Sequence, residues 1–155
     1  MIYTKTITTP ANRSIASSLP SVIQLTKGFI YKVEFDFPPG SGGLHHLIIM
    51  DGGFQVWPST LGETFHPDGY CISFDDSYLM DSAPYELTAY TWSPGTAYAH
   101  EAQIRIGLVT EEIYQARFLP SVALDLWKSM LEKQQAVKTA QANMIIENPF
   151  PWLRS

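Results

Sequence analysis

The sequence predicts a mainly β protein: a two-layer antiparallel β-sandwich, jelly-roll-like and of about eight strands, followed by one long C-terminal α-helix and an extended tail. Three observations favour this fold class. Apolar and polar side chains alternate over residues 29–37 and 101–108, as in half-buried strands. Glycine and proline turn signals separate several more short segments of this kind. From Pro120 to Pro149, neither glycine nor proline interrupts a helix-forming composition.

Eight segments have strand character, and turn residues separate most of them. They are 2–8, 22–26, 29–37, 44–50, 54–57, 70–74, 85–92 and 101–108. Eight is the strand number of a jelly roll, and a seven-stranded immunoglobulin-like sandwich is the alternative. Because only Lys27 and Gly28 separate the second segment from the third, we expect these two strands to pair as a hairpin.

The alternation also predicts which side chains form the core. In each of the two most regular strands, every second residue is apolar, so one face should be buried. The predicted core positions are Phe29, Tyr31, Val33, Phe35 and Phe37 in one strand, and Ala102, Ile104, Ile106 and Leu108 in the other.

Three regions follow from these patterns: a β-sandwich domain over 1–117, a helix over 118–142, and an extended tail rich in proline and aromatic residues over 143–155. After Glu132 the predicted helix has few apolar residues to pack against its own domain. Pro149 and Pro151 favour an extended tail. We expect the helix and tail to bind a partner through Trp127, Met130, Val137, Met144, Ile145, Ile146, Phe150, Trp152 and Leu153.

Composition excludes several classes of protein. Residues 1–117 contain six Lys or Arg against twelve Asp or Glu (net −6), and residues 118–155 contain four against three (net +1). Neither part has the basic patch of a nucleic-acid-binding protein, and no apolar run is long enough to span a membrane. Charged residues make up only 16% of the chain, which favours a homo-oligomer over a free monomer.

No motif of catalysis, cofactor binding or metal binding is expected. The sequence lacks a nucleophile elbow, a phosphate-binding glycine loop and a cysteine motif, so we expect a protein that is not an enzyme. The adjacent His45 and His46 point to opposite faces of a strand and cannot share a metal ion. The acidic segment from Asp75 to Asp81 lacks the regular spacing of a calcium loop and is expected to be a solvated turn.

Aromatic side chains suggest an alternative function. Trp57, Trp92 and Tyr98 lie at strand ends or beside loops. Flat apolar rings on a β-sandwich can stack against sugars, so these three would be the ligand-binding residues of a carbohydrate- or receptor-binding module.

Several motifs also resemble a known group of proteins. These are LTKG (25–28), VEFDFPPG (33–40), GLHH (43–46), QVWP (55–58), ISFDD (72–76) and PYELTAYTW (84–92). Over about residues 3–109 the chain resembles small β-sandwich or jelly-roll virion structural proteins of tailed bacteriophages. The resemblance implies a capsid decoration, minor capsid or other particle-associated subunit, made in the host cytoplasm and located in the virion. Its partners would be the major capsid protein or a neighbouring shell subunit.

Overall fold

We analysed a computed structural model of the chain, which describes residues 1–118, 125–126, 128–130, 132–133, 135–136 and 139–140. The chain divides into two units, Met1–Glu111 and Glu112–Ser155. The first unit contains all the strands found among the described residues. The candidate functional site lies within this unit.

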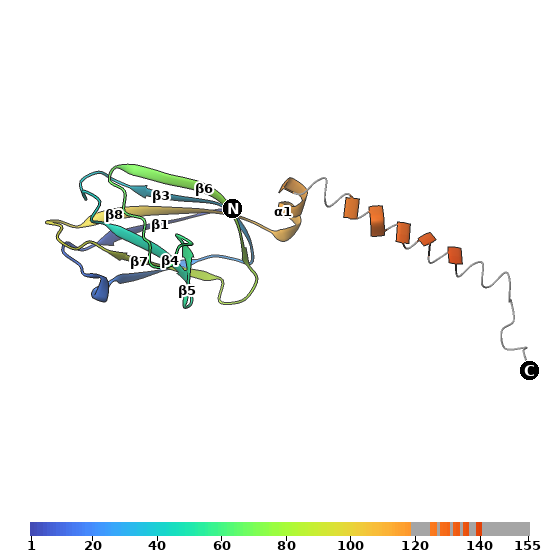
Figure 1. The fold of residues 1–155 in the computed structure, drawn as a ribbon, viewed down its shortest axis with the longest axis horizontal. Coiled ribbons are helices and arrows are strands. Elements are labelled where there is room, and N and C mark those ends of the chain that lie inside the picture. Colours follow the sequence, from blue (N-terminus) through green and yellow to red (C-terminus); the bar gives the residue numbers. More distant parts are fainter. Residues whose placement is uncertain (119–124, 127, 131, 134, 137–138, 141–155) are drawn as a thin grey trace, which may run out of the picture. The chain divides into compact units, whose positions relative to one another are not determined.

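The first unit is a β-sandwich of two four-stranded antiparallel sheets, as the sequence predicts (Figure 1). One sheet has the strand order β1-β8-β3-β6 and the other the order β2-β7-β4-β5. A short 3₁₀ helix, Ile15–Ser17, lies between the first two strands. The strands are β1 (Ile2–Thr9), β2 (Leu19–Gln24), β3 (Gly28–Phe37), β4 (His46–Asp51), β5 (Phe54–Trp57), β6 (Tyr70–Met80), β7 (Glu86–Trp92) and β8 (His100–Val109).

The strand order follows a simple rule. Each strand pairs with its counterpart counted from the other end of the series: β1 with β8, β2 with β7, β3 with β6 and β4 with β5. Two further pairings, β3 with β8 and β4 with β7, complete the sheets. The chain is therefore folded back on itself at the β4–β5 turn, and successive strand pairs alternate between the two layers.

Apolar side chains from both sheets fill the space between the layers. The β8 prediction is confirmed, because Ala102, Ile104, Ile106 and Leu108 are all buried. From β3, Phe35 is fully buried, and its ring lies 5.0 Å from Phe65 and 6.1 Å from Phe74 between centroids.

The predicted core face of β3 is correct only from Val33 onward. A β-bulge between Ile30 and Lys32 shifts the register with both neighbouring strands. Ile30 is therefore fully buried, whereas Phe29 and Tyr31 are half-buried. A bulge adds one residue to one strand, so the alternation of faces is interrupted there.

The predicted hairpin between β2 and β3 is wrong, because these strands belong to different sheets. Gly28 lies where the chain enters the second layer, with φ of 152°. A β-carbon at this position would lie 2.3 Å from the Val109 carbonyl oxygen and 2.7 Å from Leu108 Cδ2. The sequence signal for a tight turn thus marks a crossover that needs the close approach of a glycine.

The acidic segment that we expected to be a turn is largely strand. β6 runs without a break from Tyr70 to Met80 and pairs with β3 over most of that length. Its inward side chains are apolar or aromatic, except Asp76, which accepts a hydrogen bond from the indole of Trp57. Polar residues at the outward positions make the second half of this strand hard to recognise in the sequence.

A short helix, α1 (Glu111–Phe118), follows β8, so helix begins before the predicted boundary at residue 118. The described residues from 125 to 140 are helical, but a single helix over 118–142 is not shown. Met130 is described and 56% exposed. Among the described residues, no helix is both long and apolar enough to cross a membrane. The other predicted partner-binding residues lie outside the described residues: Trp127, Val137, Met144, Ile145, Ile146, Phe150, Trp152 and Leu153.

We expect Gly28→Ala to lower the free energy of unfolding by about 2 kcal/mol, because the new methyl group collides with the β8 backbone and disfavours the native φ. Gly53→Ala is the matched control, since a β-carbon there meets no atom within 4 Å. It should change stability by less than about 0.5 kcal/mol. Urea unfolding of both variants checks this, and equal effects would contradict the crossover argument.

Candidate functional site

The two sheets present very different outer faces. On the outer face of the β1-β8-β3-β6 sheet, the register places Arg105 opposite Glu34. The Arg105 guanidinium lies 3.2 Å from the Glu34 carboxylate and 3.6 Å from that of Asp36. Lys32 adds a longer ion pair, 3.9 Å, to Glu34. This face is charged, hydrogen-bonded and suited to water.

The outer face of the β2-β7-β4-β5 sheet is largely apolar, with Thr88 between Val22 and Met50 and a hydrogen bond from Gln24 to Glu86 at one end. On β4 and β7 the alternate residues are buried in the core, so the residues between them point outward. The register places Tyr90 of β7 between Pro20 of β2 and Ile48 of β4. We call this surface the apolar face, and it consists of Pro20, Val22, Ile48, Met50, Tyr90 and Trp92.

A groove of about 380 Å³ runs over the apolar face. The β1–β2 connection forms one wall and the β4–β5 turn forms another. Among the described residues that line it, none carries a formal charge, and the polar side-chain groups are two hydroxyls, of Ser18 and Tyr90, and the indole N–H of Trp92. The lining residues are Ile15, Ser18, Ile48, Met50, Gly52, Gly53, Tyr90 and Trp92. Such a groove can bind apolar and aromatic groups.

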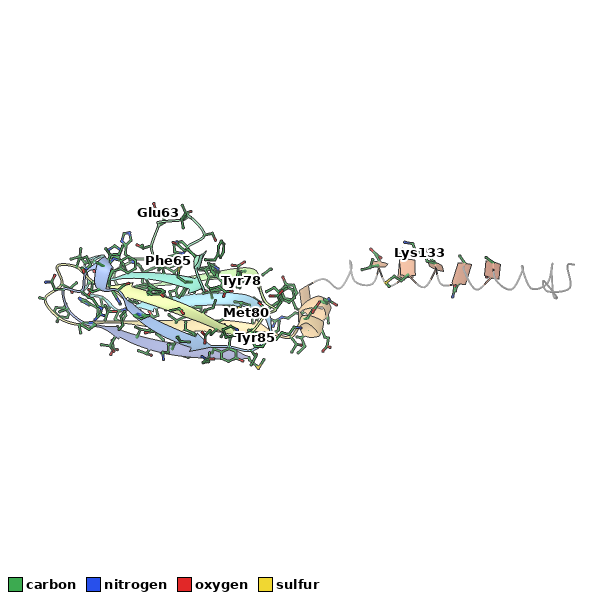
Figure 2. The ribbon with its side chains drawn as sticks, turned by 90° about the horizontal axis from the view of Figure 1, so that it is seen from below. Glu63, Phe65, Tyr78, Met80, Tyr85 and Lys133 are labelled. Carbon is green, nitrogen blue, oxygen red and sulfur yellow. The ribbon has the colours of Figure 1, made fainter. Side chains whose placement is uncertain are left out.

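The Gln55 side chain holds the first part of the loop between β5 and β6. Its amide nitrogen donates to the carbonyl oxygens of Pro58 (2.7 Å), Thr60 (3.1 Å) and Glu63 (3.1 Å). Figure 2 shows the loop standing out from the strands at Glu63, while Phe65 lies back over them. The backbone of Phe65 exchanges two hydrogen bonds with that of Leu47 in β4.

This loop also positions the aromatic end of the groove. The Thr64 hydroxyl lies 2.8 Å from His46 Nδ1. The His46 ring is stacked on Trp92, with centroids 5.4 Å apart and planes 4° from parallel. Trp92 is therefore held between the sheet and an imidazole ring, and lines the groove in a fixed orientation.

All four histidines of the chain gather near this end of the sandwich. Ring centroids lie 6.0 Å apart for His45 and His100, and 4.9 Å apart for His46 and His66. His45 and His46 are neighbours in sequence and point to opposite faces, as predicted. The cluster therefore passes through the sheet, with one pair in the interior and one beside the groove.

The interior pair includes a buried hydrogen-bond chain between the two sheets. The Thr9 hydroxyl donates to the Thr91 hydroxyl (2.7 Å) and lies 2.9 Å from His45 Nε2. Since the Thr9 proton is used toward Thr91, Nε2 of His45 carries a proton and donates to Thr9. Burial, then the nearby His100 and His46, lowers the pKa of His45 to about 4. His45 is therefore neutral near pH 7.

The loops at this end are tied to one another. Asp68, in the β5–β6 loop, accepts hydrogen bonds from the backbone N–H groups of Gly40 (2.7 Å) and Ser41 (2.9 Å) in the β3–β4 loop. The bond from Gly40 is the main reason that the pKa of Asp68 is lowered. Tyr98, in the β7–β8 loop, donates to the Gly40 carbonyl oxygen (3.0 Å).

The predicted carbohydrate platform of Trp57, Trp92 and Tyr98 is wrong. Trp57 is 2% exposed, and its indole N–H donates to Asp76 Oδ2 over 2.6 Å. Trp92 is 5% exposed and covered by His46, whereas Tyr98 is 57% exposed. Two of the three rings are buried because each has found a partner inside the fold, so the three do not form one exposed surface.

The apolar face contains residues that the sequence argument did not select, chiefly Ile48, Met50 and Tyr90. The sequence does contain a signal for the two residues of β4. Residues 47–50 of β4 form an unbroken apolar run, which is typical of a strand buried on both faces. Among the described residues, no group of three or more His, Cys, Asp or Glu side chains is arranged to hold a metal ion.

Comparison with known proteins gives a distant structural likeness. No protein-family model matches the sequence, and no curated protein matches it. A solved structure, the crystal structure of FlhE, is similar with 11% sequence identity and a TM-score of 0.37, covering 68% of this chain and 94% of that one.

We expect the stability of the protein to fall as the pH drops from 6.5 toward 4. The unfolded chain binds a proton at His45 below its ordinary pKa of 6.5, whereas the folded protein does not until about pH 4. Stabilisation from neutral His45 is thus complete above pH 6.5. The loss on acidification should approach about 3 kcal/mol, since one pKa unit corresponds to about 1.4 kcal/mol.

Urea unfolding at pH 7.0 and pH 4.5 measures this effect. His45→Gln keeps an N–H donor but cannot titrate, so its stability should depend less on pH than that of the wild type. If both proteins lose stability equally over this interval, the acid sensitivity arises elsewhere, for example at carboxylates.

Proposed function

We propose that the protein is a non-enzymatic structural subunit of a virus particle. It would bind other virion proteins, namely the major capsid protein or a neighbouring shell subunit, and associate with further copies of itself. In this proposal it is made in the host cytoplasm and located in the virion as a decoration, minor capsid or other particle-associated protein. Nucleic acid, membrane and cofactors have no part in it.

The apolar face is the observation that carries this proposal. Proteins seldom leave a continuous apolar surface to water, and such surfaces mark sites of protein or ligand binding. Here the opposite sheet has an ion-paired centre on its outer face, where Arg105 contacts Glu34, and its exposed apolar residues Ile2 and Leu79 lie on the edge strands. The difference between the two faces therefore supports a contact with another protein on one side only.

The strand order of the sandwich and the C-terminal sequence support the same function. We infer that the sandwich is a jelly roll, because the strand orders β1-β8-β3-β6 and β2-β7-β4-β5 correspond to two Greek keys wound together. We also infer that a long helix and an extended tail follow it as an assembly arm. Jelly rolls are common among viral capsid proteins, which agrees with the resemblance of residues 3–109 to phage virion proteins.

A matched pair of substitutions tests the proposal. Val22→Asp places a charge on the apolar face, at a side chain that is 43% exposed on edge strand β2. Thr6→Asp places the same charge at an exposed position on edge strand β1 of the opposite sheet, β1-β8-β3-β6. Both variants should fold, because neither position is buried.

Each variant is produced in the infected host, and its amount in gradient-purified particles is measured by mass spectrometry relative to the major shell protein. We expect wild type and Thr6→Asp to be present at a fixed ratio, and Val22→Asp to be reduced at least about tenfold, which corresponds to about 1.4 kcal/mol. Absence of the wild-type protein from particles would refute the proposed function.

A further inference from the structure

We propose that the groove on the apolar face binds the C-terminal tail, residues 143–155, of a second copy of the chain. This inference rests on the proposed function and specifies how copies join. The groove is the acceptor and the tail is the donor, so each copy would provide one of each.

The chemistry of the two surfaces matches. The groove offers aromatic and aliphatic side chains, including Tyr90, Trp92, Ile48 and Met50, and no formal charge among its described lining. The tail sequence, NMIIENPFPWLRS, contributes five large apolar residues within thirteen positions: Ile145, Ile146, Phe150, Trp152 and Leu153. Residues of this kind gain most from leaving water.

The prolines of the tail indicate a face rather than a sheet edge. A segment that extends a sheet must donate backbone hydrogen bonds along the edge strand, and Pro149 and Pro151 have no N–H group to donate. Proline-containing segments instead dock into aromatic-lined grooves, because their extended conformation is already formed and little entropy is lost. The groove beside Tyr90 and Trp92 is of this type.

Charge favours the same pairing. Residues 1–117 have a net charge of −6, from six basic and twelve acidic residues. Residues 118–155 contain four basic residues, Lys128, Lys133, Lys138 and Arg154, against Asp125, Glu132 and Glu147, a net charge of +1. Opposite net charges increase the rate at which two copies meet in this orientation.

A second copy is favoured over the same copy's tail by composition, since a chain with only 16% charged residues tends to associate with further copies. A donor and an acceptor on different surfaces of one chain give a head-to-tail contact, which closes into rings or extends into filaments.

Complementation between two full-length variants tests this arrangement. Ile15→Asp alters the groove at a side chain that is 66% exposed, so the sandwich should remain folded. A double variant, Phe150→Asp with Trp152→Asp, alters the tail. Each variant alone should associate at least about tenfold more weakly than wild type in sedimentation equilibrium.

The mixture gives the decisive result. The groove variant still donates an intact tail and the tail variant still offers an intact groove, so an equimolar mixture should form a one-to-one heterodimer that grows no further. Ile2→Asp is the matched control, since this isoleucine is 72% exposed on the β1-β8-β3-β6 sheet, away from the groove. It should associate like wild type.

Three results would overturn the inference: a mixture that stays monomeric, a tail variant that still self-associates like wild type, or a wild-type protein that is monomeric at micromolar concentration. Particle incorporation separates this inference from the proposed function. If complementation fails but the wild type is still found in particles, only the tail contact is refuted. If complementation succeeds but the wild type is absent from particles, the contact stands and the virion role fails.

Discussion

The arrangement of this molecule depends on the alternation of side chains in the β2-β7-β4-β5 sheet. A strand sends alternate side chains to opposite faces, so a strand that is apolar at successive positions can bury only half of them in its own core. Leu47 and Ile49 of β4 enter the core, and Ile48 and Met50 are left on the outside. On the β1-β8-β3-β6 sheet, Arg105, Glu34 and Asp36 occupy the centre of the outer face, and the exposed Ile2 and Leu79 lie on the edge strands. The apolar face is therefore encoded in strands β2, β4 and β7 rather than in any loop.

A second constraint holds the two sheets together at the end where the histidines gather. Thr9 belongs to one sheet and Thr91 to the other, and their hydroxyl groups share a buried hydrogen bond that also involves His45. A buried polar group without a partner costs about 1–3 kcal/mol, so these three side chains are stable only as a set. Their set fixes the spacing of the layers and, through the adjacent His46, the orientation of Trp92 at the groove.

Much of the fold could be predicted because alternation is a local property. All eight strands were found from the sequence, and β8 was assigned with the correct buried face. Pairing is not local, so the short link at Lys27 and Gly28 was taken for a hairpin when it crosses between layers. The bulge at Ile30 and the buried state of Trp57 were also missed, because each depends on a partner from a distant strand.

The candidate site was missed for a related reason. Sequence reasoning sought exposed rings, whereas the face combines aliphatic residues of β2 and β4 with aromatic residues of β7, strands that are neighbours only after folding. Once they are assembled, the outer face of one sheet has an ion-paired centre and that of the other has an apolar groove. In the proposed function, the first face would remain solvated and the second would contact another protein. The apolar C-terminal sequence has the complementary composition, so a single chain can encode both halves of a repeating contact.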